Sequence, residues 1–200
     1  MKSTDRRART SAPVRSTLML GVTLLLLAGC ASRAPTPATD ERPAVTPEQQ
    51  ARWQEALILL ESGDRDQARQ RFEQLHRQAL QLSGPLVNLC VMNFEDDRTD
   101  EAEACFGQVL TLRPEHPVAL THLGVLARKA GEFERADALY RQALAADPDH
   151  APAVLNLAIL LDMYRGEPAE ALTLYERYLS LIPEEDPTVQ NWVIDLKNRL

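Results

Sequence analysis

The sequence predicts an all-α fold: a right-handed α-solenoid of about four helical hairpins followed by one capping helix. Pro114 and Pro148 are 34 residues apart, and Pro183 follows 35 residues later, each after the same helical pattern. Repetition at a fixed period near 34 is typical of stacked helical hairpins, because each hairpin buries its apolar face against the next. The chain of 200 residues is long enough for one short array of this kind.

Residues 1–29 have the features of an export signal. A leader rich in lysine and arginine precedes an apolar run from Leu18 to Ala28, which is 11 residues long. Such a run is too short to cross a membrane as a helix, but it fits the hydrophobic region of a signal peptide. We therefore expect these residues to be removed on export.

The segment Leu27-Ala28-Gly29-Cys30 closes this signal and resembles the lipobox of bacterial lipoproteins. The resemblance implies a covalent lipid on Cys30 that anchors the chain to a membrane, whereas the alternative is an ordinary signal peptide before a chance cysteine. Several acyl chains hold a protein stably on a bilayer, while one chain binds reversibly. Ala31 stands where an aspartate often retains such lipoproteins in the inner membrane, so the resemblance favours the outer membrane and the periplasm.

Residues 30–47 are predicted to be the lipidated cysteine and a linker. Pro35, Pro37 and Pro43 lie among short polar residues, a composition that cannot build a core and favours an extended chain. At about 3.1 Å per residue, this tether would hold the folded part some tens of ångströms from the membrane.

The predicted array covers residues 48–185, in blocks at 49–82, 83–116, 117–150 and 151–185. In the third block the small residues Gly124 and Ala136 occupy the eighth and twentieth positions, and Tyr140 follows four residues later. Small residues let two helices approach closely, and an aromatic ring at i+4 fills the space beside them on the same helix face. The equivalent residues are Cys90, Ala102 and Phe106 in the second block and Ala158, Ala171 and Tyr175 in the fourth.

With Leu123, Ala143 and the final proline, this pattern resembles the tetratricopeptide repeat over residues 49–200. The resemblance implies a helix A and a helix B in each block, with Gly63, Gly131 and Gly166 at the turns between them, where a left-handed cap is needed. The first block lacks the final proline, so it is predicted to be a degenerate N-terminal repeat; an unrelated helical hairpin is the alternative.

Residues 186–200 are predicted to form the capping helix. Asp186 can cap a helix whose first residue is Pro187. The residues that follow place one apolar stripe along this helix, at Val189, Trp192, Val193, Leu196 and Leu200. Such a helix would cover the open face of the fourth repeat, although a docking helix for a partner would show the same stripe.

The resemblance also implies a concave groove lined by the helix A of each repeat. Most of the side chains at these positions are apolar, which favours a site for an extended or helical segment of a protein partner. Arg128 and Lys129 are candidates to pair with an acidic group of that segment. The predicted groove residues are Trp53, Leu57, Val87, Val91, Thr121, Val125, Arg128, Lys129, Leu155, Ile159 and Asp162.

The cysteines, the short motifs and the net charge limit the kinds of site that the chain can have. Cys90 and Cys105 either form a disulfide, which an oxidising compartment permits, or pack as free thiols. The sequence contains no CxxC pair, zinc spacing, HExxH, GxSxG or phosphate loop, so we predict no catalytic residue, no metal and no cofactor other than the lipid. The net charge of −7 makes nucleic-acid binding unfavourable.

These features together predict a protein-interaction adaptor without enzymatic activity, which helps to assemble or position a machine of the cell envelope. The architecture is similar to that of pilotin-type lipoproteins of type IV pili and of repeat lipoproteins associated with TonB systems. The alternatives are a recruiter or regulator of a peptidoglycan enzyme, a component of a TonB-type energy-transduction system, and a carrier of a small ligand or lipid.

Overall fold

Nine α-helices and one π-helix make up the regular structure of residues 44–200, the part of the chain that the computed structural model describes. No strand occurs in these residues, and the predicted all-α solenoid is confirmed. The predicted signal peptide, the lipidation site Cys30 and the prolines at 35, 37 and 43 lie outside the described residues.

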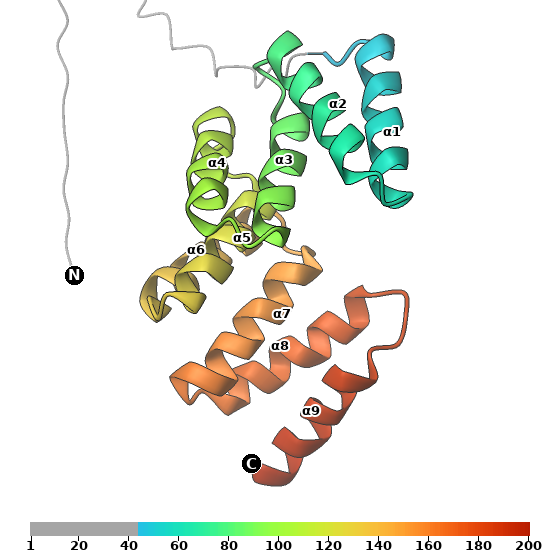
Figure 1. Ribbon diagram of the computed structural model, residues 1–200. Coiled ribbons are helices and arrows are strands. Elements are labelled where there is room, and N and C mark those ends of the chain that lie inside the picture. The colour runs from blue at the N-terminus through green and yellow to red at the C-terminus, as the bar shows by residue number, and fades with distance from the viewer. Residues whose placement is uncertain (1–43) are drawn as a thin grey trace, which may run out of the picture. The chain divides into compact units, whose positions relative to one another are not determined.

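The helices pair in chain order into hairpins, and each hairpin lies against the next (Figure 1). We use helix A and helix B for the first and second helix of a hairpin. The hairpins are α1 (Pro47–Glu61) with α2 (Arg65–Gln78), α3 (Ser83–Glu95) with α4 (Thr99–Leu112), α5 (Pro117–Lys129) with α6 (Phe133–Ala146), and α7 (Ala151–Leu160) with α8 (Pro168–Leu181). The π-helix η1 (Leu161–Arg165) continues α7, and α9 (Pro187–Arg199) ends the array.

Local sequence explains where several helices begin. At α1, Thr46 accepts a hydrogen bond from the backbone N–H of Gln49, whose side chain accepts one from the Thr46 N–H in return. This capping box satisfies donors that no preceding turn can reach. Proline occupies a first-turn position of α5, α8 and α9, where its missing N–H costs nothing and its fixed φ already suits a helix.

The turn between helix A and helix B has the same backbone conformation in every hairpin. Gly63, Gly131 and Gly166 have φ of +84°, +80° and +68°, as the sequence predicts. In the second hairpin a non-glycine residue, Asp97, takes the equivalent position with φ of +53°. Asp and Asn tolerate this left-handed region better than most side chains do, so Asp97 can adopt the turn conformation that glycine adopts in the other hairpins.

Small residues and aromatic rings pack against each other inside each hairpin at the predicted repeat positions. Gly124 lies so close to the ring of Tyr140 that a Cβ built on it would be 2.5 Å from Tyr140 Cε1. The small residues of helix B, Ala68, Ala102, Ala136 and Ala171, and the rings of Phe72, Phe106, Tyr140 and Tyr175 are all fully or almost fully buried. Close backbone approach and ring filling therefore hold each pair of helices together.

The fourth hairpin is one residue longer than the period of 34, and the π-helix η1 lies where the extra residue falls. A π-helix takes up more residues per turn than an α-helix, so the insertion is absorbed at the end of helix A. The turn after it still reaches the left-handed conformation at Gly166. As a result the side chains of Met163 and Tyr164 project outward, 67% and 44% exposed.

Helix α9 closes the array as the predicted capping helix. Asp186 accepts a hydrogen bond from the backbone N–H of Val189, 3.1 Å away, and so caps the helix. The buried face of α9 joins the apolar cluster of α6, α7 and α8, while its other face is mostly polar. The members that α9 contributes to this cluster are Val189, Val193 and Leu196.

Candidate functional site: the helix A wall

The candidate binding surface is built from helices A of the second, third and fourth hairpins. We call it the helix A wall. Five of its apolar side chains are partly exposed, one or two from each helix, and they rest on the buried clusters of the array. The wall consists of Val91, Phe94, His122, Val125, Arg128, Lys129, Leu155, Asn156, Ile159, Asp162 and Tyr164.

Two of the residues predicted to line the groove are buried instead. Val87 is 9% exposed and packs in the cluster between α3 and α5, and Thr121 is 3% exposed. The Thr121 hydroxyl donates to the carbonyl of Pro117, 2.8 Å away, so its polar atom is satisfied within its own helix. Neighbouring repeats pack closely enough to cover the fifth position of helix A in these two hairpins. These two side chains therefore belong to the packing of the array.

The first hairpin contributes packing at the same positions. The indole of Trp53 lies against α3, where a Cβ built on Gly84 would be 3.6 Å from Trp53 Cζ2. Leu57 packs on the small cluster around Ala56 and Phe72. Both side chains are partly buried, as the apolar side chains of the wall are.

Aromatic rings and a histidine join α3 to α5 on the wall. The His122 ring stacks on Phe106 at a centroid distance of 4.9 Å and meets the edge of Phe94 at 5.1 Å. Its Nδ1 lies 2.8 Å from the carbonyl of Val118. Burial lowers the pKa of His122, so the ring is neutral at neutral pH.

The sixth position of helix A has one structural role in three hairpins. Asn88 and Asn156 donate from Nδ2 to the carbonyls of Gly84 and Pro152, at 3.0 and 2.8 Å, and His122 contacts the equivalent carbonyl. Each of these side chains contacts the carbonyl four residues earlier in its own helix, so its polar group is satisfied locally.

The two cations of the wall are held by neutral groups. Arg128 donates from Nη2 to Asn156 Oδ1 at 3.3 Å, and its guanidinium carbon lies 5.9 Å from the centroid of the Tyr164 ring. Lys129 Nζ lies 4.9 Å from the centroid of the Phe94 ring. Such cation–π contacts stabilise a charge without neutralising it. Tyr164 was not predicted, because only the π-helix brings it here; the one signal in the sequence is the extra residue of the fourth block.

The acidic side chains at equivalent positions already have cationic partners. Asp162 Oδ1 lies 3.3 Å from Nη2 of Arg199, which reaches it from α9, and the Asp162 side chain is only 14% exposed. Glu95 Oε2 lies 2.8 Å from Nη1 of Arg65 on α2. These two carboxylates therefore do not neutralise Arg128 or Lys129.

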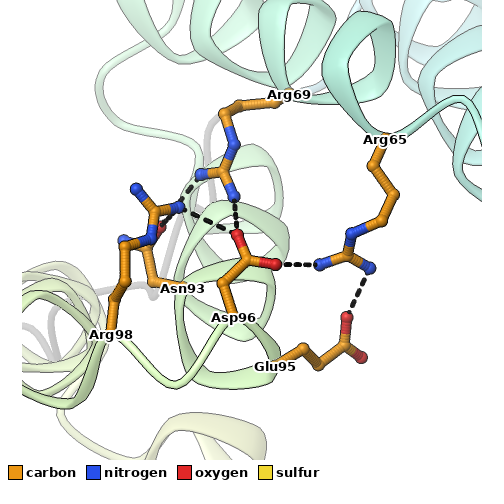
Figure 2. A network of polar contacts seen from close by, with 6 residues as sticks. All are labelled: Arg65, Arg69, Asn93, Glu95, Asp96 and Arg98. Carbon is orange, nitrogen blue, oxygen red and sulfur yellow. Dashed lines mark hydrogen bonds and ion pairs between the residues drawn. The ribbon is translucent and has the colours of Figure 1, made fainter.

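A network of charges joins the first hairpin to the second (Figure 2). Asp96 contacts Arg65, Arg69 and Arg98 at 2.9, 2.7 and 3.1 Å, and Asn93 accepts hydrogen bonds from Arg69 and Arg98. Burial by itself would raise the pKa of Asp96. The three arginines outweigh burial and lower this pKa below its ordinary value. The network crosses from α2 to the turn after α3, so it fixes one hairpin on the next.

A disulfide joins Cys90 on α3 to Cys105 on α4, with their Cα atoms 5.3 Å apart. Cys90 occupies the eighth position, where other repeats have a small residue in close contact with helix B. The sequence does not decide between a disulfide and two free thiols, because spacing alone does not tell whether two sulfur atoms face each other. It fixes the two helices of the second hairpin to each other.

Between residues 44 and 200, no group of His, Cys, Asp and Glu side chains could hold a metal ion. In the same range no helix is both long and apolar enough to cross a membrane. A polar pocket between α1 and α2 is lined by Arg52, Glu55, Arg71, Gln74 and Leu75, away from the helix A wall.

Family models of the tetratricopeptide repeat match residues 49–74, 94–136 and 127–192. The matches cover parts of all four hairpins. The chain is a tetratricopeptide repeat protein. Repeats of this family are typically non-catalytic scaffolds that bind other proteins, so this chain belongs to the class of protein-interaction proteins.

Solved structures show the same fold at low sequence identity. PilF of Pseudomonas aeruginosa is 19% identical with a TM-score of 0.64, over 76% of this chain and 68% of PilF. MamA from Desulfovibrio magneticus RS-1 is 20% identical with a TM-score of 0.59, over 78% and 87%. The Yersinia enterocolitica type III secretion chaperone SycD, in complex with a peptide of the translocator YopD, is 18% identical with a TM-score of 0.51, over 57% and 91%. No curated protein sequence matches the chain.

Proposed function

We propose that this tetratricopeptide repeat protein is anchored by a lipid on Cys30 to the outer membrane and faces the periplasm. There it binds a segment of a partner protein on the helix A wall and so helps to assemble or position a machine of the cell envelope. The observation that carries the proposal is the wall itself: partly exposed apolar side chains on the helices A of three successive hairpins, with two cations among them.

The disulfide supports the proposed location in the periplasm. Disulfides persist in oxidising surroundings such as the bacterial periplasm and are rare in the reducing cytosol. A bond between α3 and α4 fits a chain that folds after export. The disulfide is an observation independent of the resemblance between the segment at Cys30 and a lipobox.

A neighbour in the fold supports the mode of binding. SycD shares the fold and was crystallised with a peptide of its translocator YopD. An array of this kind can therefore hold a peptide segment of another protein. For the present chain, we propose that Val91 and Val125 lie under such a segment.

Photo-crosslinking in cells tests the adaptor. A photoreactive amino acid at Val91 or Val125 should trap one discrete partner, identified by mass spectrometry. The same amino acid at Gln108 or Gln142, exposed residues of helices B, is the control. Equal trapping from all four positions would contradict a partner site on the wall.

Two variants test the helix A wall and the anchor separately. Val91→Glu with Val125→Glu should abolish partner capture while the circular dichroism spectrum stays that of a folded helical protein. Cys30→Ala should release the chain from the membrane fraction and abolish labelling by a palmitate analogue. If the Cys30→Ala protein stays in the outer membrane, the lipid anchor is not what holds it there.

A further inference from the structure

We infer that the partner segment carries an acidic side chain, and that Arg128 and Lys129 select this segment by pairing with its carboxylate. This inference rests on the proposed function, because it names the chemistry of the segment that the helix A wall binds. It goes beyond the proposal in assigning specificity to two residues.

Arg128 and Lys129 differ from most other cations of the chain in having no carboxylate partner. Between residues 44 and 200, the lysines and arginines other than Arg113, Arg128 and Lys129 each contact a carboxylate of the chain itself. The chain has 29 acidic residues against 22 lysines and arginines, so acids to pair with are plentiful. Two adjacent cations without a carboxylate on a partly apolar surface are therefore an exception in this molecule.

The acidic side chains at the equivalent positions of α3 and of the segment after α7 already have other partners, so they do not neutralise these cations. Glu95 is held by Arg65 at 2.8 Å, and Asp162 by Arg199 at 3.3 Å. Both arginines come from helices outside the wall, α2 and α9. The positive charge of α5 on the wall therefore stays available to a partner.

Both cations are held in place before a partner binds. Asn156 and Tyr164 fix the guanidinium of Arg128, and Phe94 lies under the ammonium of Lys129. A charge that is already oriented loses little conformational freedom on binding. The partly exposed Val125 and Ile159 lie on the same wall, and a bound apolar segment would cover them and exclude water from the ion pair. A pair that is shielded in this way is stronger than one in open water.

These contacts define the segment. It has an Asp or Glu that meets the two cations and apolar residues on either side that cover the valine and isoleucine side chains of the wall. Arg128 suits a carboxylate in particular, because its planar guanidinium can donate two parallel hydrogen bonds to the two oxygens. Lys129 adds charge from the next position of the same helix.

A displayed library of random dodecapeptides, selected on the full chain, tests the inference. We expect the selected peptides to be enriched in one Asp or Glu flanked by apolar residues. The enriched peptide should bind about ten-fold more tightly than the same peptide with Gln at that position. This preference should weaken as sodium chloride is raised, because salt screens the pair.

The matched variants separate this charge from charge in general. Arg128→Gln with Lys129→Gln should abolish the preference for Glu over Gln, while Arg77→Gln with Arg113→Gln, which removes two cations away from the wall, should leave it unchanged. Selected peptides without any acidic preference would overturn the inference and leave the proposed adaptor standing. If no peptide is selected at all, while a control protein of known specificity selects its own, both the inference and the proposed function fail.

Discussion

The two ends of the array are attached in different ways. The first hairpin meets the second through the arginine network around Asp96 and a small apolar cluster, and the charged side chains are 22–49% exposed. At the other end, α6, α7, α8 and α9 share one large apolar cluster. Exposed ion pairs contribute little and are screened by salt, whereas buried apolar area contributes much and is not. We therefore expect the first hairpin to separate from the array more easily than the last.

The largest expected effect comes from the apolar end. Tyr175 is 1% exposed and lies 5.5 Å from Trp192 of α9, measured between ring centroids. Tyr175→Ala should lower the free energy of unfolding by about 3–5 kcal/mol, because it leaves a cavity at the junction of α8 and α9. Urea denaturation measures this change, and it should be the same at low and high salt. Tyr164→Ala, at an exposed tyrosine, should cost less than about 1 kcal/mol; equal costs would contradict the buried role of Tyr175.

The contact between Gly124 and Tyr140 tests the packing inside a hairpin. Gly124→Ala places a Cβ where Tyr140 Cε1 would be only 2.5 Å away, so the ring or the helix must shift. We expect a loss of about 1–3 kcal/mol from this overpacking. Gly107→Ala is the matched control, since nothing lies within 4 Å of its Cβ position on the exposed face of α4. That substitution should stabilise the protein by about 0.5–1 kcal/mol, and a loss there would point to an effect other than packing.

The pH dependence of stability tests the connection between the second and third hairpins, where His116 lies. Burial, with a smaller effect of Arg113, lowers the pKa of His116 from 6.5 to about 4. The unfolded chain therefore binds this proton at a higher pH than the folded chain does. The contribution of His116 is complete above about pH 6.5 and is lost as pH falls toward about 4. Between pH 7.5 and pH 5 the free energy of unfolding should drop by about 2 kcal/mol from this group.

His116→Gln should reduce this drop, as measured by urea denaturation at both pH values. Burial also lowers the pKa values of His122 and His150, so part of the dependence should remain in the variant. A drop of unchanged size in His116→Gln would mean that another group titrates in this range.

The smallest expected effect comes from the charged end. Asp96→Asn keeps the shape of the side chain but removes the charge that Arg65, Arg69 and Arg98 share. Because these groups are partly exposed, we expect a loss of only about 1 kcal/mol. The loss should shrink in concentrated sodium chloride. Hydrogen exchange should become faster in α1 and α2 but not in α8 and α9; uniform acceleration would contradict a local junction.

The sequence by itself determined the repeat, the helix pairs and the contact of small residues with rings. These features follow from local rules: residues at i and i+4 share a helix face, proline ends a helix, and glycine permits a left-handed turn. The predictions at Gly124, Tyr140 and Gly131 needed only spacing along one chain segment, and the structure places all three as expected.

Only the tertiary structure decided which helix A positions stay exposed and which charges meet. Val87 and Thr121 occupy groove positions in the sequence, yet the neighbouring repeats cover them. Asp96 meets Arg65 and Arg69 because two hairpins lie side by side, and Tyr164 reaches Arg128 because a π-helix absorbs an inserted residue. Each of these facts depends on the distance between residues that lie in different hairpins, and spacing along the sequence does not contain that distance.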